Sequence, residues 1–226
     1  MVPMDYTRLL GDSFDYTKEA LWGRWTRWLL LLVSTIIFPL IYGYSVRVMS
    51  GTKPAPEPEG WIGLFVDGIK LFVIAIVYAI PLWILAAVGI AAYFIPVSVT
   101  TTTPGTVSGP GPETGIFVLL ALIVIFVVLA IVIGILSTFA MVRFARTGKM
   151  REAFRFGTLL SHIGRVGWSN IFIALLLLGI VIVVVEFVLM LIPALGGLLV
   201  FIFTPAFIIF SARLLALLYE SAPALA

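Results

Sequence analysis

Four stretches of the chain each run for more than 20 residues with at most one charged side chain. An α-helix of about 20 apolar residues crosses the roughly 30 Å hydrocarbon core of a membrane, and the core helix of a soluble domain needs far fewer. Charged residues make up 11% of the sequence, against about 25% in soluble domains. The chain is therefore predicted to be an all-α, polytopic transmembrane helical bundle without a separate soluble core.

The four long hydrophobic segments lie at residues 71–95, 116–142, 171–192 and 198–218, and a shorter fifth one lies at 28–46. They define a single transmembrane domain over residues 28–219, preceded by residues 1–27 and followed by a tail at 220–226. Segment 28–46 contains Pro39 and Gly43 and has two interpretations. It is either a fifth span, which places the N-terminus outside, or a re-entrant hairpin that enters and leaves on the cytoplasmic side, which places both termini inside.

Residues 5–22 are too polar to cross a membrane, although their apolar side chains recur at helical spacing. The apolar stripe consists of Tyr6, Leu9, Leu10, Phe14 and Leu21, opposite Arg8, Asp12, Asp15 and Glu19. Tryptophans 22, 25 and 28 then interleave with Arg24 and Arg27, a pattern typical of the membrane interface. We therefore expect an amphipathic interfacial helix within residues 1–27.

A basic connector between the third and fourth segments sets the predicted orientation. It runs from Arg143 to Trp168 and carries six of the fourteen Lys and Arg residues, namely Arg143, Arg146, Lys149, Arg151, Arg155 and Arg165. The positive-inside rule makes this connector cytoplasmic, with its basic face toward lipid headgroups, and places the link at 96–115 and the tight turn at 193–197 outside. Three segments end at Arg47, Arg143 and Arg213, whose side chains are expected to snorkel to the cytoplasmic headgroups.

Two short motifs recur along the chain. Pro39-x5-Ser45-x-Arg47 is matched by Pro205-x5-Ser211-x-Arg213, and the run of Gly51 and Phe65-x-x-Gly68 after Arg47 is matched by Gly148 and Phe154-x-x-Gly157 after Arg143. The matches suggest a parallel repeat of span, basic exit, short interfacial helix and span. Matches this short also arise by chance, so internal duplication and coincidence both stay open.

Glu186 is the only ionisable residue well inside an apolar run. A carboxylate at such depth costs about 3 kcal/mol, so its position is a functional hypothesis by default. Thr204 lies at the same distance from the turn at 193–197 and could be its hydrogen-bond partner. Three alternatives stay open: a protonated or water-contacting residue near the outer interface, a hydrogen-bonded link between helices, and an ion or proton relay.

Other patterns indicate packing and anchoring. Small residues form a stripe that permits close helix approach, within one protomer or between protomers: Ala75, Ala79, Ala86 and Gly89. Asp67 and Lys70 are spaced to pair across one helical turn as an interfacial anchor. His162 is predicted to lie with Arg155 and Arg165 on a solvated or headgroup-facing side of one helix.

Several classes of chemistry are excluded or disfavoured. The chain has no cysteine and one histidine, which excludes disulfides, thiolate sites and multi-histidine metal sites. It contains no phosphate-binding Walker A loop, dinucleotide-binding glycine fingerprint, HExxH or GxSxG motif. We therefore expect no cofactor, no metal, no nucleic-acid partner and no enzymatic activity.

Residues 43–48 (GYSVRV), the Pro-rich acidic link and Trp61-x-x-Leu64-Phe65-x-x-Gly68-x-Lys70 resemble a known family. It is an uncharacterised, mostly archaeal family of polytopic membrane proteins, catalogued as domain of unknown function number 4013. The resemblance covers about residues 5–215, and residues 143–157 look like the family's second cytoplasmic connection. It implies no functional residues, and the paired acids that usually precede the tryptophan are replaced here by Glu57, Glu59 and Gly60.

The leading functional hypothesis is a non-enzymatic structural or accessory subunit, or a membrane organiser, in the cell (plasma) membrane. Its expected partners are membrane lipids and either further copies of itself or a membrane protein complex. The alternative is a small transporter or channel that uses Glu186. A lipid-acting enzyme is a third hypothesis, which needs a polar pocket around His162 or Glu186.

Overall fold

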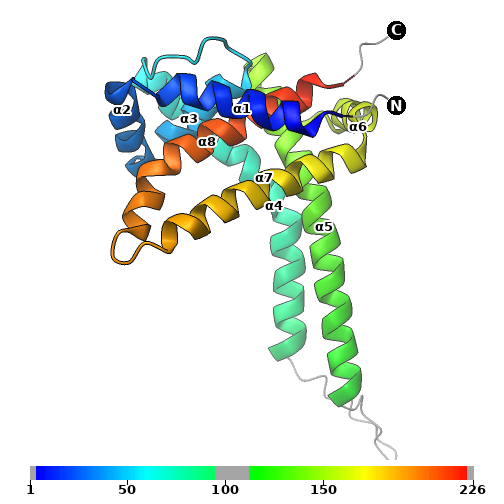
Figure 1. Ribbon diagram of the computed structural model, residues 1–226. Helices are drawn as coiled ribbons and strands as arrows, with labels where there is room; N and C mark the ends of the chain where they lie inside the picture. The colour runs from blue at the N-terminus through cyan, green and yellow to red at the C-terminus, as the bar shows by residue number, and fades with distance from the viewer. Residues whose placement is uncertain (1–3, 95–111, 223–226) are drawn as a thin grey trace, which may run out of the picture. The chain divides into compact units, whose positions relative to one another are not determined.

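The computed structural model describes residues 4–94 and 112–222, which form eight α-helices and one 3-10 helix, with no β-strand among them (Figure 1). The elements are α1 (Tyr6–Leu21), α2 (Trp25–Ile36), α3 (Phe38–Met49), α4 (Trp61–Phe94), α5 (Pro112–Thr147), η1 (Met150–Phe154), α6 (Phe156–Val166), α7 (Trp168–Met190) and α8 (Gly196–Glu220). Within these residues, α4, α5, α7 and α8 are long and apolar enough to cross a membrane. The predicted all-α bundle with four long segments is confirmed. Most of the link at 96–115 lies outside the described residues.

Contacts divide the chain into two units, Met1–Ala75 with Ile135–Ala226, and Ile76–Gly134. The first unit contains α1 to α3, the first turns of α4, the end of α5, and everything from η1 to α8. The second contains the remaining parts of α4 and α5. The five buried polar or charged side chains of the described residues, including Arg27 and Arg213, all belong to the first unit.

Segment 28–46 is not one long helix, so its interpretation as a fifth span is wrong. It falls within α2 and α3, which have 12 residues each and contact one another. A 12-residue helix is about 18 Å long, too short to cross roughly 30 Å of hydrocarbon. The break falls at Ile37 rather than at Gly43. Pro39 lies in the first turn of α3. Backbone N–H groups have no acceptor within the helix at that place, so the missing N–H of proline costs no hydrogen bond.

Gly43 serves instead as a contact point between α3 and α4. A Cβ on Gly43 would lie 1.8 Å from the carbonyl oxygen of Leu64, and one on Gly68 would lie 1.8 Å from that of Pro39. The backbones of α3 and α4 therefore touch at these two glycines, because no side chain separates the helices there. Residues of the family-like motifs at 43–48 and 61–70 thus form one close helix crossing.

The amphipathic helix predicted near the N-terminus is present as α1, which begins at an Asp5 cap and packs along α8. Its buried residues are Leu9, Ser13, Tyr16, Ala20 and Leu21. Phe14, which belongs to the predicted apolar stripe, is 62% exposed. The side of α1 that is buried in the protein differs from that stripe, because it includes Ser13, Tyr16 and Ala20 but not Phe14.

α8 bends partway along its length (Figure 1), and the helix contains Pro205 in its interior. Proline removes one helical hydrogen bond and pushes against the preceding turn, which is the usual cause of such a bend. The tight turn predicted at 193–197 joins α7 to α8, with Ala194 at φ 61°. Gly196 is buried there, and its missing Cβ would lie 2.8 Å from the Cα of Met190.

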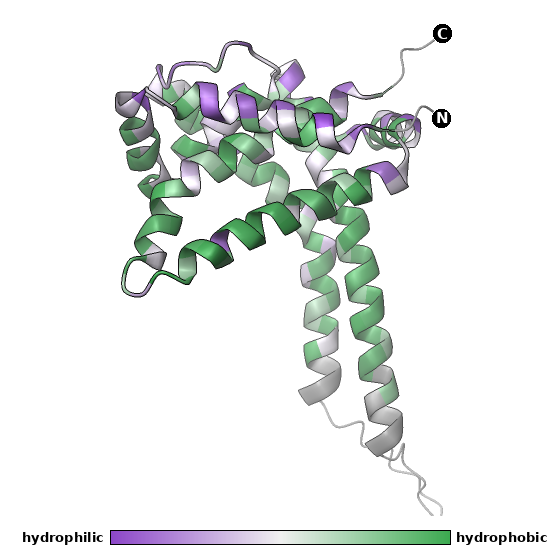
Figure 2. Ribbon diagram, viewed as in Figure 1, coloured by the Kyte–Doolittle hydropathy of each residue, from purple (hydrophilic) through white to green (hydrophobic). Residues whose placement is uncertain are grey.

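Long-range hydrogen bonds bring several polar segments of the first unit together. The Tyr6 hydroxyl donates to Asn170 Oδ1 at the start of α7 (3.2 Å), and the Tyr16 hydroxyl donates to the Thr52 carbonyl after α3 (3.0 Å). α1 therefore joins the start of α7 to the link at 51–60. Figure 2 shows hydrophilic residues on α1 and on this link, and largely hydrophobic residues along α7.

The proposed internal repeat is matched only in part. Gly51 and Gly148 both follow an arginine-bearing helix and both have positive φ, 89° and 66°. After Gly148 the chain forms η1 and α6 before α7, so the single connector helix predicted there is interrupted at Arg155. No helix lies between Gly51 and α4. A short helix distinct from the following span therefore occurs only in the second of the two matched segments.

Candidate functional site in the polar layer beneath α1

A polar layer lies where α1, the α2–α3 hairpin and α8 meet, and we define it by the buried residues Tyr16, Arg27, Tyr44 and Arg213 together with the exposed Glu57. Arg27, at the start of α2, is 4% exposed. Its guanidinium donates to both carboxylate oxygens of Glu57 and to the Ala20 carbonyl. This hydrogen bond holds the pKa of the Glu57 carboxyl below its usual value. The pair ties the start of the hairpin to the link that follows its end.

The end of the hairpin is held by the same link. The Tyr44 hydroxyl donates to the Pro56 carbonyl (2.9 Å), and Arg47 Nη1 donates to the Glu59 carbonyl (2.6 Å). Arg47 therefore donates to backbone oxygens of the link, and its extension to the headgroups stays a prediction. Since Arg27 and Arg47 both reach the link at 57–59, the two ends of the hairpin lie at the same level.

Arg213, on α8, differs from Arg27, the other arginine of the layer. Only 1% of it is exposed, and its Nε and Nη1 atoms have no hydrogen-bond partner. Its guanidinium carbon lies 4.9 Å from the centre of the Tyr16 ring, a cation–π contact from α1. The prediction that Arg213 snorkels to the headgroups is wrong, because α1 covers it.

Three of the six basic residues of the connector form ion pairs with two glutamates. Arg143 Nη2 lies 2.6 Å and Arg155 Nη1 3.0 Å from carboxylate oxygens of Glu152, and Arg146 pairs with Glu220 at the end of α8. The hydrogen bond from Arg143 lowers the pKa of Glu152. Of the six predicted residues, Lys149 and Arg151 are exposed without an ion pair among the described residues.

His162 is not on a solvated face but joins α6 to the end of α8. Its ring stacks on Tyr219 with centroids 4.0 Å apart, its Nε2 lies 2.9 Å from the Tyr219 carbonyl oxygen, and Arg165 Nη2 lies 3.2 Å from its Nδ1. Arginine has no acceptor, so Nδ1 accepts and the proton of neutral His162 is on Nε2. Burial lowers the pKa of His162, and Arg165 and Arg143 lower it further.

Glu186 and Thr204 do not form the predicted pair. The Thr204 hydroxyl donates to the Val200 carbonyl of its own helix (2.9 Å). Glu186 is half-buried on α7 between exposed apolar residues, and no hydrogen bond or ion pair reaches it from the described residues. The predicted Asp67–Lys70 pair, in contrast, is present at 3.1 Å.

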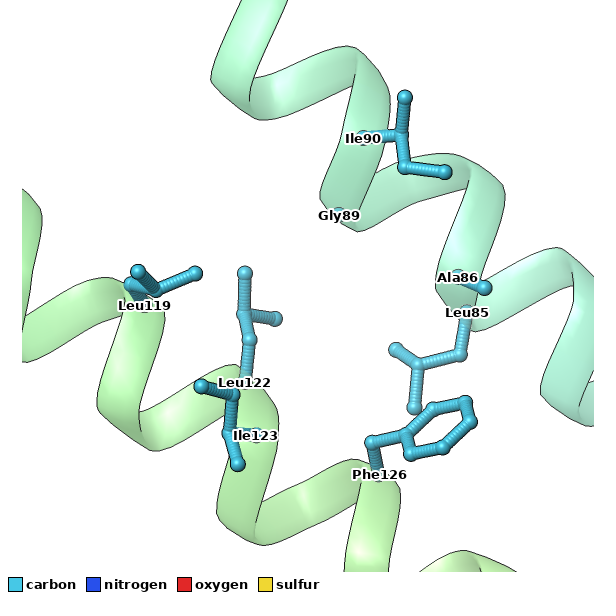
Figure 3. Close-up of a pocket in the computed structure, with 8 residues that line it drawn as sticks. All are labelled: Leu85, Ala86, Gly89, Ile90, Leu119, Leu122, Ile123 and Phe126. Carbon is cyan, nitrogen blue, oxygen red and sulfur yellow. The ribbon is translucent and has the colours of Figure 1, made fainter.

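The small-residue stripe on α4 does not form one continuous close contact with another helix among the described residues. Within the second unit, Ala86 and Gly89 line a groove of about 390 Å³ with Phe126 and other apolar side chains of α5 (Figure 3). A Cβ on Gly89 would meet nothing within 4 Å. Ala75 and Ala79, earlier on α4, are half-buried. Packing of this stripe between protomers stays a prediction.

Sequence reasoning missed the residues that define the polar layer. Arg27 and Glu57 were assigned to two separate features, an aromatic and basic belt and a surface link. Tyr16 lies outside the apolar stripe assigned to the N-terminal helix. Two signals singled out Arg213, namely its position at the end of a segment and the Pro-x5-Ser-x-Arg motif that it shares with Arg47.

Comparison with known proteins gives one match. A family described as "Protein of unknown function (DUF4013)" matches residues 28–194. No curated protein and no solved structure matches the chain. The matched range runs from α2 through α7, so α1 and α8 lie outside it.

Proposed function

Since the chain belongs to the DUF4013 family, a family of unknown function, we propose from its geometry that it is a non-enzymatic membrane organiser. It crosses the cell membrane four times and inserts the α2–α3 hairpin into the cytoplasmic leaflet only. The extra helices enlarge the protein's cross-section in that leaflet. Its direct partners are lipids, and it acts by changing how they pack.

The observation that carries the proposal is a short hairpin whose two ends are both bound to the link at 57–59 and whose outer apolar surface is not covered by protein. Each arm is about 18 Å long, enough to pass through one leaflet of about 15 Å but not through two. The outer side exposes Leu29, Val33 and Ile36, with 71% of Ile36 exposed. Acyl chains are the surroundings in which such a surface is stable.

The start of the hairpin has the residue types that are common in the headgroup region. Trp22 and Trp25 are exposed where α2 begins, and Arg24 lies beside them. Aromatic and basic residues are enriched at that depth because they combine apolar and polar parts. The polar bonds of α1 to the link and to α7 support placing the N-terminus on the connector side, which the positive-inside rule makes cytoplasmic.

Transport through Glu186 receives less support, because no second polar side chain is brought to it among the described residues. The proposed lack of enzymatic activity rests on the sequence, with its single histidine and no cysteine. That histidine is half-buried against Tyr219.

Reconstitution into vesicles tests the organiser function. We expect the full chain, added at rising protein-to-lipid ratios, to shift vesicles toward smaller diameters or tubules in electron cryomicroscopy. Ile36→Asp should abolish the shift, because it places a carboxylate at the depth of the acyl chains without removing a packed side chain.

Ile62→Asp is the matched control. Ile62 is 83% exposed at the start of α4, outside the hairpin, so this variant should still reshape vesicles. Unchanged vesicles with the wild-type chain, or equal reshaping by Ile36→Asp and the wild type, would refute the proposal.

A further inference from the structure

Arg213 has a buried charge that no ion pair among the described residues neutralises. Its Nε and Nη1 atoms are shielded from solvent and lack an acceptor, and no ion pair reaches it among the described residues. Burying a charge without an anionic partner is strongly unfavourable. Arg27, at similar burial, shows the satisfied arrangement, with acceptors for all three of its nitrogens.

Among the described residues, no carboxylate forms an ion pair with Arg213. Glu57 is already bound by Arg27 and lies 3.6 Å from Arg24. The acidic residues of α1, Asp12, Asp15 and Glu19, line an open pocket with Tyr16 and Lys53. The Tyr16 ring is therefore the compensating group that the described residues supply to the guanidinium.

α1, the helix that covers Arg213, packs along α8. α1 buries only two large aliphatic side chains, Leu9 and Leu21. Its other long-range anchors are the hydroxyl bonds of Tyr6 and Tyr16. Phe14 is already exposed on its outer edge, so a detached α1 keeps an apolar surface with which to lie in the membrane interface.

We propose that Arg213 is an anion-binding residue that takes a phosphoryl group when α1 lifts from α8. The anion and the Tyr16 ring compete for the same guanidinium. A planar guanidinium forms its strongest hydrogen bonds with phosphate and carboxylate oxygens. A phosphoryl group can come from a lipid headgroup or from free phosphate, and this site goes beyond the proposed function because it does not involve the hairpin.

The position of α1 can be measured directly because the chain has no cysteine. Spin labels are attached to Phe14→Cys on α1 and Ile62→Cys on α4, both highly exposed in the first unit, and the distance between them is measured by pulsed electron paramagnetic resonance. The full chain is kept in maltoside micelles, which contain no phosphate. Phosphatidylglycerol, inorganic phosphate or a galactosyl diacylglycerol is then added.

We expect phosphatidylglycerol to produce a second, altered distance and the galactolipid to produce none. An equal response to inorganic phosphate would assign the site to a soluble anion instead of a headgroup. The doubly labelled chain carrying Arg213→Met should keep one distance under all conditions, whereas Tyr16→Leu should respond at about tenfold lower lipid concentration, because the competing ring is gone.

Arg151→Met is the matched control, since Arg151 is exposed and has no ion pair among the described residues. It should respond like the parent. The proposal is overturned if neither phosphoryl compound changes the distance, if the galactolipid acts equally well, or if Arg213→Met responds like the parent.

Discussion

Replacing Gly68 by alanine would place a Cβ 1.8 Å from the carbonyl oxygen and 2.7 Å from the carbonyl carbon of Pro39. Both atoms belong to the backbone of α3, so no side-chain rotation can relieve the overlap. The helices must separate by more than 1 Å, and the polar bonds around Tyr44 must shift with them. Overpacking typically costs about 1–3 kcal/mol, and this rigid contact puts the expected loss near 3 kcal/mol.

Unfolding of the purified chain in mixed micelles, followed by tryptophan fluorescence, measures this loss. Gly179→Ala is the matched control, because Gly179 lies within α7 with nothing within 4 Å of an added Cβ. Alanine there removes backbone freedom from the unfolded chain and should leave stability unchanged or raise it by up to about 1 kcal/mol.

A double variant tests whether the two contact glycines act together. A Cβ on Gly68 would also lie 3.0 Å from the backbone nitrogen of Gly43. Once one methyl has separated the helices, the second meets less resistance, so Gly43→Ala with Gly68→Ala should cost less than the sum of the two. Equal stabilities for Gly68→Ala and Gly179→Ala would refute the close crossing.

Three further predictions concern titratable groups. The pKa of His162 is lowered in the folded chain, so as pH falls below about 6.5 the unfolded chain binds the proton before the folded chain does. The melting temperature should therefore fall from that pH downward. His162→Gln should remove the part of this pH dependence that is due to His162. The pKa of Glu57 is lowered by Arg27. The contribution of this pair to stability is therefore present above about pH 4.3 and is lost as pH falls through the pKa of Glu57 in the folded chain. Proteolysis of the link at 51–60 should rise in acid, and Glu57→Gln should show the increase already at neutral pH. Glu186→Gln should leave melting temperature and vesicle reshaping unchanged, and loss of a measurable ion flux in this variant would revive the transport hypothesis.

The long helices could be read from sequence because lipid imposes a length and composition on each span. The order of the four spans and the tight turn before α8 followed from this rule. The hairpin was left ambiguous, since its total length is near that of one span and a proline such as Pro39 can either kink a helix or end it. Only the observed helix ends distinguish the two arrangements.

The polar layer could not be predicted, because it depends on tertiary contacts between residues far apart in the chain. Glu57 reaches Arg27 across 30 positions. Snorkelling of Arg213 was a reasonable expectation at the end of a span, but it assumed that no other element covers α8. The closeness of Gly43 and Gly68 to backbone atoms was likewise invisible, although both glycines belonged to motifs already noted.

Labelling of single cysteines from one side of the membrane tests the four-span hairpin arrangement most directly. Thr7→Cys, Lys53→Cys, Lys149→Cys and Leu195→Cys each place a thiol at an exposed position of the otherwise cysteine-free chain. With a membrane-impermeant maleimide, we expect only Leu195→Cys to react in intact cells and the other three to react after permeabilisation. Reaction of Thr7→Cys in intact cells while Lys149→Cys stays protected would place the N-terminus outside and contradict the hairpin.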